Sequence, residues 1–215
     1  MKIFIPLMAE NIGFLTVIDQ CPGLTGGYLV LNRAGRPLEF HCTMPIIPDR
    51  LQQILYGDTL QPFLYGERIA QTLLHRPKLP VLSIFTDIAT VLPVQTLVST
   101  PVTYVFGGET NLEINAPSTP EISTELSESL KGFGIDNARF QTHSSCSDEV
   151  PPIPSVSGFD TRIWQGVRIG NRLIAVPEEK GKTLIEEIKE MARTIDLLEP
   201  FIRIRLALAE AKNAA

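Results

Sequence analysis

The sequence has no surplus of basic residues: its 215 residues include 19 Lys and Arg against 24 Asp and Glu, which gives a formal net charge of −5. Nucleic acids and anionic membranes recruit proteins through dense Lys and Arg, which displace bound counterions. The composition therefore argues against a nucleic-acid partner and against a membrane partner, although the overall charge does not exclude a local basic patch.

Export and membrane signals are also missing. The apolar stretch 2–7 is short and is interrupted by Pro6, so it fits neither a signal peptide nor a membrane span, and it predicts a strand instead. Cysteine is scarce, since Cys21, Cys42 and Cys146 are an odd number without the spacing of a disulfide framework. We expect a cytoplasmic protein with reduced thiols.

No catalytic, metal or nucleotide signature of known specificity occurs in the sequence. His41, Cys42, His143 and Cys146 are zinc-ligand types, but strand neighbours point to opposite faces, so His41 and Cys42 are poorly placed to share one ion. A cysteine nucleophile with a histidine base is conceivable from the same residues, yet no motif surrounds them. The run 180–183 imitates the end of a phosphate-binding loop but lacks the first glycine of that motif. Neither a metal nor a cofactor is expected.

The clearest architectural signal is a β-hairpin within residues 26–43. Asn, Gly and Pro in the stretch 32–37 are typical of a hairpin turn. The second arm alternates apolar and polar residues, which predicts one buried face and one polar face. The expected buried side chains are Leu38, Phe40 and Cys42, and the expected polar ones are Glu39, His41 and Thr43.

Two short helices are expected after this hairpin. Pro48 is placed to open the first, and Gly57 is placed to end it. Its apolar face consists of Leu51, Ile54 and Leu55. Asp58 and Gln61 have the spacing of a capping box for the second helix.

These residues also carry a resemblance to a known family. The string GYLVLNRAGRPLEF, followed by LQQILYG and YGERI, resembles an uncharacterised family of bacterial proteins over about the first half of the chain. The resemblance implies a bacterial protein that is soluble. It implies no activity and no functional residues.

The order of expected elements predicts an α+β fold, with a mostly antiparallel sheet, helices on one face, and a C-terminal hairpin followed by a long helical segment. Further strands are expected at 13–19 and 81–85 and between 94 and 106. We predict an α+β core domain over residues 1–106. A polar linker or mobile insertion with a short helix is expected over 107–158, and a hairpin plus helices over 159–215.

The C-terminal helices suggest a docking surface. Two adjacent apolar stripes run from Leu184 to Leu208 and form a face wider than one packing contact needs. Pro200 interrupts the pattern, which favours two consecutive helices over one. These helices pack either on the chain's own sheet or on another chain, so a protein partner or a homo-oligomer through Leu184–Leu208 is predicted.

The sequence favours a non-enzymatic interaction or scaffold module of a soluble bacterial assembly. The alternative is a small enzyme, with hydrolase-like or proton-transfer chemistry, whose site lies at the junction of hairpin and helix. Its catalytic residues would be His41, Asp49 and Tyr56, since histidine is a common general base and Asp49 could orient it. Asp87 follows an apolar strand, where a catalytic carboxylate is often found, but the sequence favours a helix cap.

Overall fold

The structure of the protein is a computed structural model that describes residues 10–20, 22–107 and 151–213. All of these residues fall in one structural unit. Outside the described residues lie the strand expected at 2–7, Cys21, the candidate zinc ligands His143 and Cys146, and most of the linker predicted for 107–158. Val156, at the end of that predicted linker, is buried in the core.

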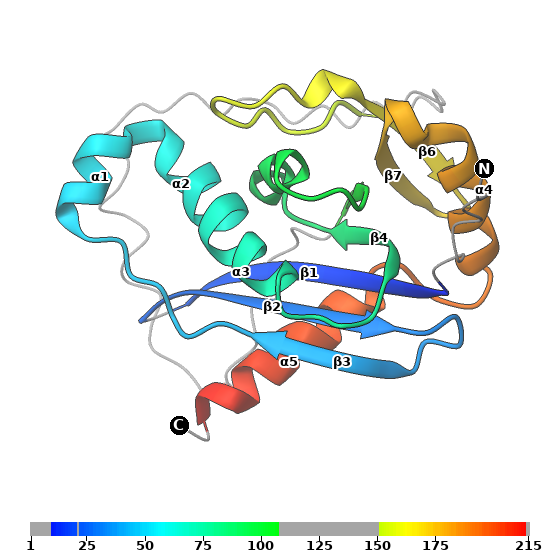
Figure 1. The fold of residues 1–215 in the computed structure, drawn as a ribbon, viewed down its shortest axis with the longest axis horizontal. Helices are drawn as coiled ribbons and strands as arrows, with labels where there is room; N and C mark the ends of the chain where they lie inside the picture. Colours follow the sequence, from blue (N-terminus) through cyan, green and yellow to red (C-terminus); the bar gives the residue numbers. More distant parts are fainter. Residues whose placement is uncertain (1–9, 21, 108–150, 214–215) are drawn as a thin grey trace, which may run out of the picture. The chain divides into compact units, whose positions relative to one another are not determined.

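A seven-stranded mixed sheet forms the centre of the fold, in the order β3-β2-β1-β4-β5-β7-β6 (Figure 1). The strands β1–β2, β2–β3, β5–β7 and β6–β7 pair antiparallel, whereas β1–β4 and β4–β5 pair parallel. The strands are β1 Asn11–Gln20, β2 Gly23–Leu31, β3 Pro37–Cys42, β4 Val81–Thr86, β5 Val102–Val105, β6 Trp164–Ile169 and β7 Arg172–Pro177.

Helical segments join and cover these strands. The α-helices are α1 Arg50–Tyr56, α2 Leu60–Pro62, α3 Gln71–Leu74, α4 Gly181–Met191 and α5 Glu199–Asn213. A π-helical stretch, Phe63–Ala70, connects α2 to α3, and shorter 3₁₀ turns occupy Gly57–Thr59, Ala89–Thr96, Thr161–Ile163 and Glu178–Lys180. The predicted α+β class, with a C-terminal hairpin followed by helices, is confirmed.

Two hydrophobic cores lie on opposite faces of the sheet. The helical segment 60–74 covers one face, and α4 and α5 cover the other. Figure 1 shows α5 crossing β1 and β2 on the face opposite α3. The N-terminal helices therefore keep to one face, as expected, while the C-terminal helices add a second layer.

Two adjacent glycines in β2 let helices approach both faces closely. A Cβ atom on Gly26 would lie 2.2 Å from Cγ2 of Ile69, and a Cβ atom on Gly27 would lie 2.3 Å from Cγ2 of Ile204. Because the side chains of consecutive strand residues point to opposite faces, each glycine serves a different helix. Larger residues here would push the helices away from the sheet.

The apolar stripes of α4 and α5 pack on the chain's own sheet. The buried members are Leu184, Ile188, Met191, Ile195, Leu197, Phe201, Ile204 and Leu208. Pro200 lies in the first turn of α5, where its missing N–H costs little, so two helices form as predicted. Most of the Leu184–Leu208 face is covered in this way, while Ile202 and Leu206 on it are exposed. A protein partner or homo-oligomer through this face stays a prediction.

The hairpin of β2 and β3 is confirmed, but the predicted faces of β3 are reversed. Leu38, Phe40 and Cys42 are exposed, while Glu39 and His41 are half-buried. The reason is that β3 is an edge strand and that α5 packs on β1 and β2. The other side of β3 is covered in part by the loop before β4, whose backbone N–H groups at residues 78 and 79 bond to Glu39.

Local details also differ from the sequence-based predictions. Asp49, and not Asp58, supplies the capping box in this region, since the Asp58 turn lacks a side-chain cap. The segment expected as strands between 94 and 106 begins with a 3₁₀ helix and gives only β5. Both differences concern helix caps and turns, and neither changes the order of the strands in the sheet.

Candidate functional site

The most prominent exposed apolar surface lies on α1 and on the segment before it. Its five large side chains are between 64% and 82% exposed. We call them the α1 surface, which consists of Met44, Ile47, Leu51, Ile54 and Leu55. Other large exposed apolar residues come from separate segments, namely Leu38, Phe40, Leu79, Leu97, Ile163, Ile202 and Leu206. Only the α1 surface gathers so many within one short stretch of the described chain.

The sequence builds α1 through defined ends. The Asp49 carboxylate accepts the backbone N–H of Gln52 at 2.7 Å, and the Gln52 side chain accepts the Asp49 N–H at 3.2 Å. Gly57 ends the helix with a φ of 50°, a conformation that glycine adopts without steric cost. Spacing of three and four residues places Leu51, Ile54 and Leu55 on one face. The helix therefore presents a continuous apolar stripe.

This helix has little support from the rest of the chain. Six of its residues are exposed and Gln52 is half-buried. Its main contacts are with the turn and the helix that follow it, and the ring of Tyr56 stacks on Phe63 with centroids 4.4 Å apart. A seven-residue helix is marginal in water by itself, because helices of this length gain most of their stability from packing of an apolar face. Within residues 10–20, 22–107 and 151–213, the α1 surface lacks such packing.

The predicted catalytic residues have separate surroundings. His41 Nε2 lies 3.0 Å from Oε2 of Glu39, and this contact is the main cause that lowers the pKa of Glu39. Asp49 caps α1, while Tyr56 stacks on Phe63 and lines a different, small hollow of 250 Å³. Among the described residues no interaction joins His41 to Asp49. Their proton-transfer role stays a prediction without a shared contact to support it.

Asp87 is the one carboxylate among the buried polar residues of the described chain. It follows β4, and its Oδ2 accepts a hydrogen bond from Nη2 of Arg205 on α5. Burial raises the pKa of Asp87, and the Arg205 charge opposes that rise. The helical turn after it has no side-chain cap, so the predicted capping role of Asp87 is wrong. Because the carboxylate is enclosed and paired, it serves to hold α5 on the sheet.

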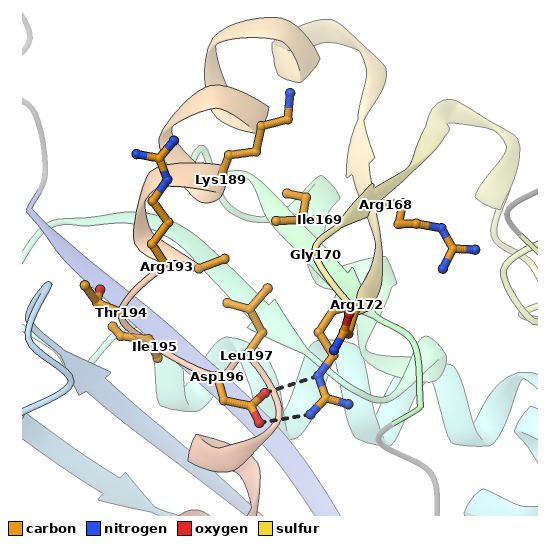
Figure 2. Close-up of a pocket in the computed structure, with 12 residues that line it drawn as sticks. Arg168, Ile169, Gly170, Arg172, Lys189, Arg193, Thr194, Ile195, Asp196 and Leu197 are labelled. Atoms are coloured by element: carbon orange, nitrogen blue, oxygen red, sulfur yellow. Dashed lines mark hydrogen bonds and ion pairs between the residues drawn. The ribbon is translucent and has the colours of Figure 1, made fainter. Parts of the chain in front are cut away.

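A hollow of 680 Å³ lies between the β6–β7 turn and the segment that joins α4 to α5 (Figure 2). Arg172 donates to both carboxylate oxygens of Asp196, at 3.2 and 2.9 Å. Figure 2 shows the charged end of Arg168 on the opposite side of the view from the charged ends of Lys189 and Arg193. Ligand sites bring polar groups together on one ligand. This hollow does not, so it is a weaker candidate than the α1 surface.

The described residues contain no cluster of metal-ligand side chains and no membrane-spanning helix. Cys42 is an exposed free thiol, and no group of three His, Cys, Asp or Glu side chains in the described ranges could hold a metal ion. No described helix has the length and apolar character needed to cross a membrane.

Comparisons with known proteins add little to this picture. No protein-family model matches the chain, and no curated protein matches it either. Among solved structures, a match is found to the X-ray crystal structure of Marinitoga piezophila Argonaute in complex with 5' OH guide RNA, with 7% sequence identity and a TM-score of 0.25. The match covers 46% of this chain and 16% of the Argonaute chain. A likeness this weak carries no argument about function.

Proposed function

We propose that the protein is a non-enzymatic interaction module that docks a protein through the α1 surface. The observation that supports this is a capped helix whose apolar stripe is exposed along its whole length. Burial of apolar area is the main favourable contribution to protein association, at about 25 cal/mol per Å². Exposed apolar patches of this kind are typical of interaction sites.

The position of the α1 surface suits docking. Its residues follow β3, which is an edge strand of the sheet, and α1 makes few contacts with the two hydrophobic cores. A partner could cover the stripe without disturbing the sheet. The Leu184–Leu208 face, in contrast, packs most of its apolar side chains on the sheet and exposes only Ile202 and Leu206 among its large apolar residues.

The enzyme alternative has weaker support. Proton transfer requires a base within hydrogen-bond reach of the proton that it removes and a group that orients that base. Glu39, and not Asp49, contacts the His41 ring, the Asp49 carboxylate is used by the helix cap, and among the described residues no interaction joins His41 to Tyr56. We therefore favour docking over catalysis for the segment that joins the hairpin to α1.

Site-specific photo-crosslinking tests the proposed function. With photoreactive benzoylphenylalanine in place of Leu51, the full chain should form an adduct with a second polypeptide in the cells that naturally produce it. Adding Ile54→Asp should reduce that adduct at least about tenfold, because a charge would have to be desolvated in the apolar contact. The measurement is the adduct mass, followed by peptide mapping of the crosslinked residues.

Ile163 provides the matched control, because it is an exposed apolar residue on a separate segment. The photoreactive group at position 163 should give no adduct that depends on Ile54. The proposal would be contradicted by equal adducts at positions 51 and 163. A crosslink formed only within one molecule, for example to its own residues 108–150, would contradict it as well.

A further inference from the structure

We propose that the α1 surface docks a second copy of this chain, with the two α1 helices antiparallel across a two-fold axis. This inference rests on the proposed function and names its partner. Charged side chains flank the apolar stripe, and their placement allows a two-fold symmetric contact.

Opposite charges stand at the two ends of the stripe. Arg50 is the first residue of α1, and Asp58 follows Gly57 at its end; both are exposed. Within the described part of the chain, neither side chain takes part in an ion pair. Exposed charges beside an apolar surface are the usual rim of a protein interface.

The sequence spacing makes this surface complementary to itself. A two-fold axis that passes by Ile54 places the first turn of each α1 beside the end of α1 in the other copy. Arg50 of each copy then meets Asp58 of the other, while the stripes of Leu51, Ile54 and Leu55 face each other. An isologous contact of this kind uses the same patch twice, so both ion pairs form together.

The alternative orientation is unfavourable. Parallel helices would place Arg50 opposite Arg50 and Asp58 opposite Asp58, and like charges repel at this distance. Asp49 lies next to Arg50, but its carboxylate is directed to the Gln52 N–H of its own helix. The antiparallel arrangement is therefore the one in which both the apolar stripe and the free charges find partners.

The expected association is weak. A standard stable interface buries about 800 Å² on each partner, and five side chains supply only the apolar centre of such an area. We expect a dimer with a Kd on the order of 10 µM, which puts it in the class of small, transient interfaces.

Charge exchange tests this arrangement directly. Analytical ultracentrifugation of the full chain from about 1 to 500 µM should show a monomer–dimer equilibrium. Arg50→Asp and Asp58→Arg should each raise the Kd about fivefold or more, since two symmetry-related pairs are lost and like charges are brought together. The double variant should return to within about twofold of the natural chain, because the pairs reform with reversed charges.

The design separates docking from folding. An acidic residue in the first turn and a basic residue after the last turn both suit the helix dipole, so neither single variant should weaken α1 itself. The control is Arg162→Asp, which changes the net charge in the same way as Arg50→Asp does. Its side chain is 90% exposed and lies on another segment. It should leave the Kd unchanged.

The outcomes distinguish this inference from the proposed function. A natural chain that stays monomeric at 500 µM, or a double variant as weak as the single ones, overturns the antiparallel dimer. If the position-51 adduct then has the mass of this chain plus a different protein, docking through the α1 surface stands with another partner. If the adduct at position 51 is also absent, both proposals fail.

Discussion

Replacing Arg205 with Met should lower the free energy of unfolding by about 3 kcal/mol at neutral pH, because the Asp87 carboxylate would stay buried without its cation. Asp87 is fully buried and Arg205 reaches it from α5 with a side chain that is 24% exposed. Urea denaturation of the natural chain and the variant measures the difference.

The size of this effect should depend on pH in a defined direction. Burial raises the pKa of Asp87 above 3.8, so the folded chain binds this proton more tightly than the unfolded chain does. The stability that comes from this tighter proton binding is fully present below the pKa that Asp87 has in the unfolded chain. It is lost as the pH rises through the pKa that Asp87 has in the folded chain. The Arg205 charge lowers the pKa of Asp87, so without Arg205 this pKa rises further. The variant therefore loses more stability than the natural chain as the pH rises. The defect of Arg205→Met should shrink as the pH is lowered from neutrality.

Arg172→Met is the control, since it breaks an Arg–Asp ion pair with Asp196 in which the two side chains are 38% and 50% exposed. We expect it to cost less than about 1 kcal/mol. Equal costs for the two variants, or a defect of Arg205→Met that does not change with pH, would mean that Asp87 is not held as a buried partner of α5.

Phe201→Ala should be the other strongly destabilising change, with a loss of about 4 kcal/mol in the free energy of unfolding. Phe201 is fully buried, and its ring meets that of Phe14 edge-on with centroids 5.4 Å apart. Phe14 in turn stacks on Phe85 at 5.2 Å. Truncation would leave a cavity between α5 and the middle of the sheet. Thermal or urea unfolding monitored by circular dichroism measures the loss.

The neighbouring residue supplies the control for this prediction. Ile202 is 43% exposed, so Ile202→Ala should cost about 1 kcal/mol or less. If Ile202→Ala proved as costly as Phe201→Ala, α5 would have to present a different face to the sheet. If neither had an effect, the helix would not be part of the core.

The sequence predicted those elements whose causes are local. The turn at 32–37, the end of α1 at Gly57 and the break before α5 at Pro200 each depend on residues next to one another in the chain. Helix and strand periodicity likewise placed the stripes of α1 and α5 correctly. These features follow from backbone preferences, which do not depend on the rest of the fold.

What the sequence could not provide is which apolar faces are covered. Alternation along β3 shows that Phe40 and His41 face opposite ways, but the position of α5 decides which of them is buried. The stripes of α1 and of α4 and α5 look alike in sequence, yet only the C-terminal ones pack on the sheet. The pairing of Asp87 with Arg205 is invisible for the same reason, because 118 positions separate the two residues.

The placement of α5 has a consequence for the order in which the protein is made. Residues 199–213 cover one face of strands formed by residues 11–31, so that face must wait until the chain up to α5 has been synthesised. The hairpins of β1, β2 and β3 can form earlier, since their contacts are close in sequence. During that interval the side chains of Phe14, Leu29 and Leu31 are exposed to water and to other nascent chains. Exposed apolar surface of this kind promotes aggregation, so we expect chaperones to bind the emerging N-terminal sheet.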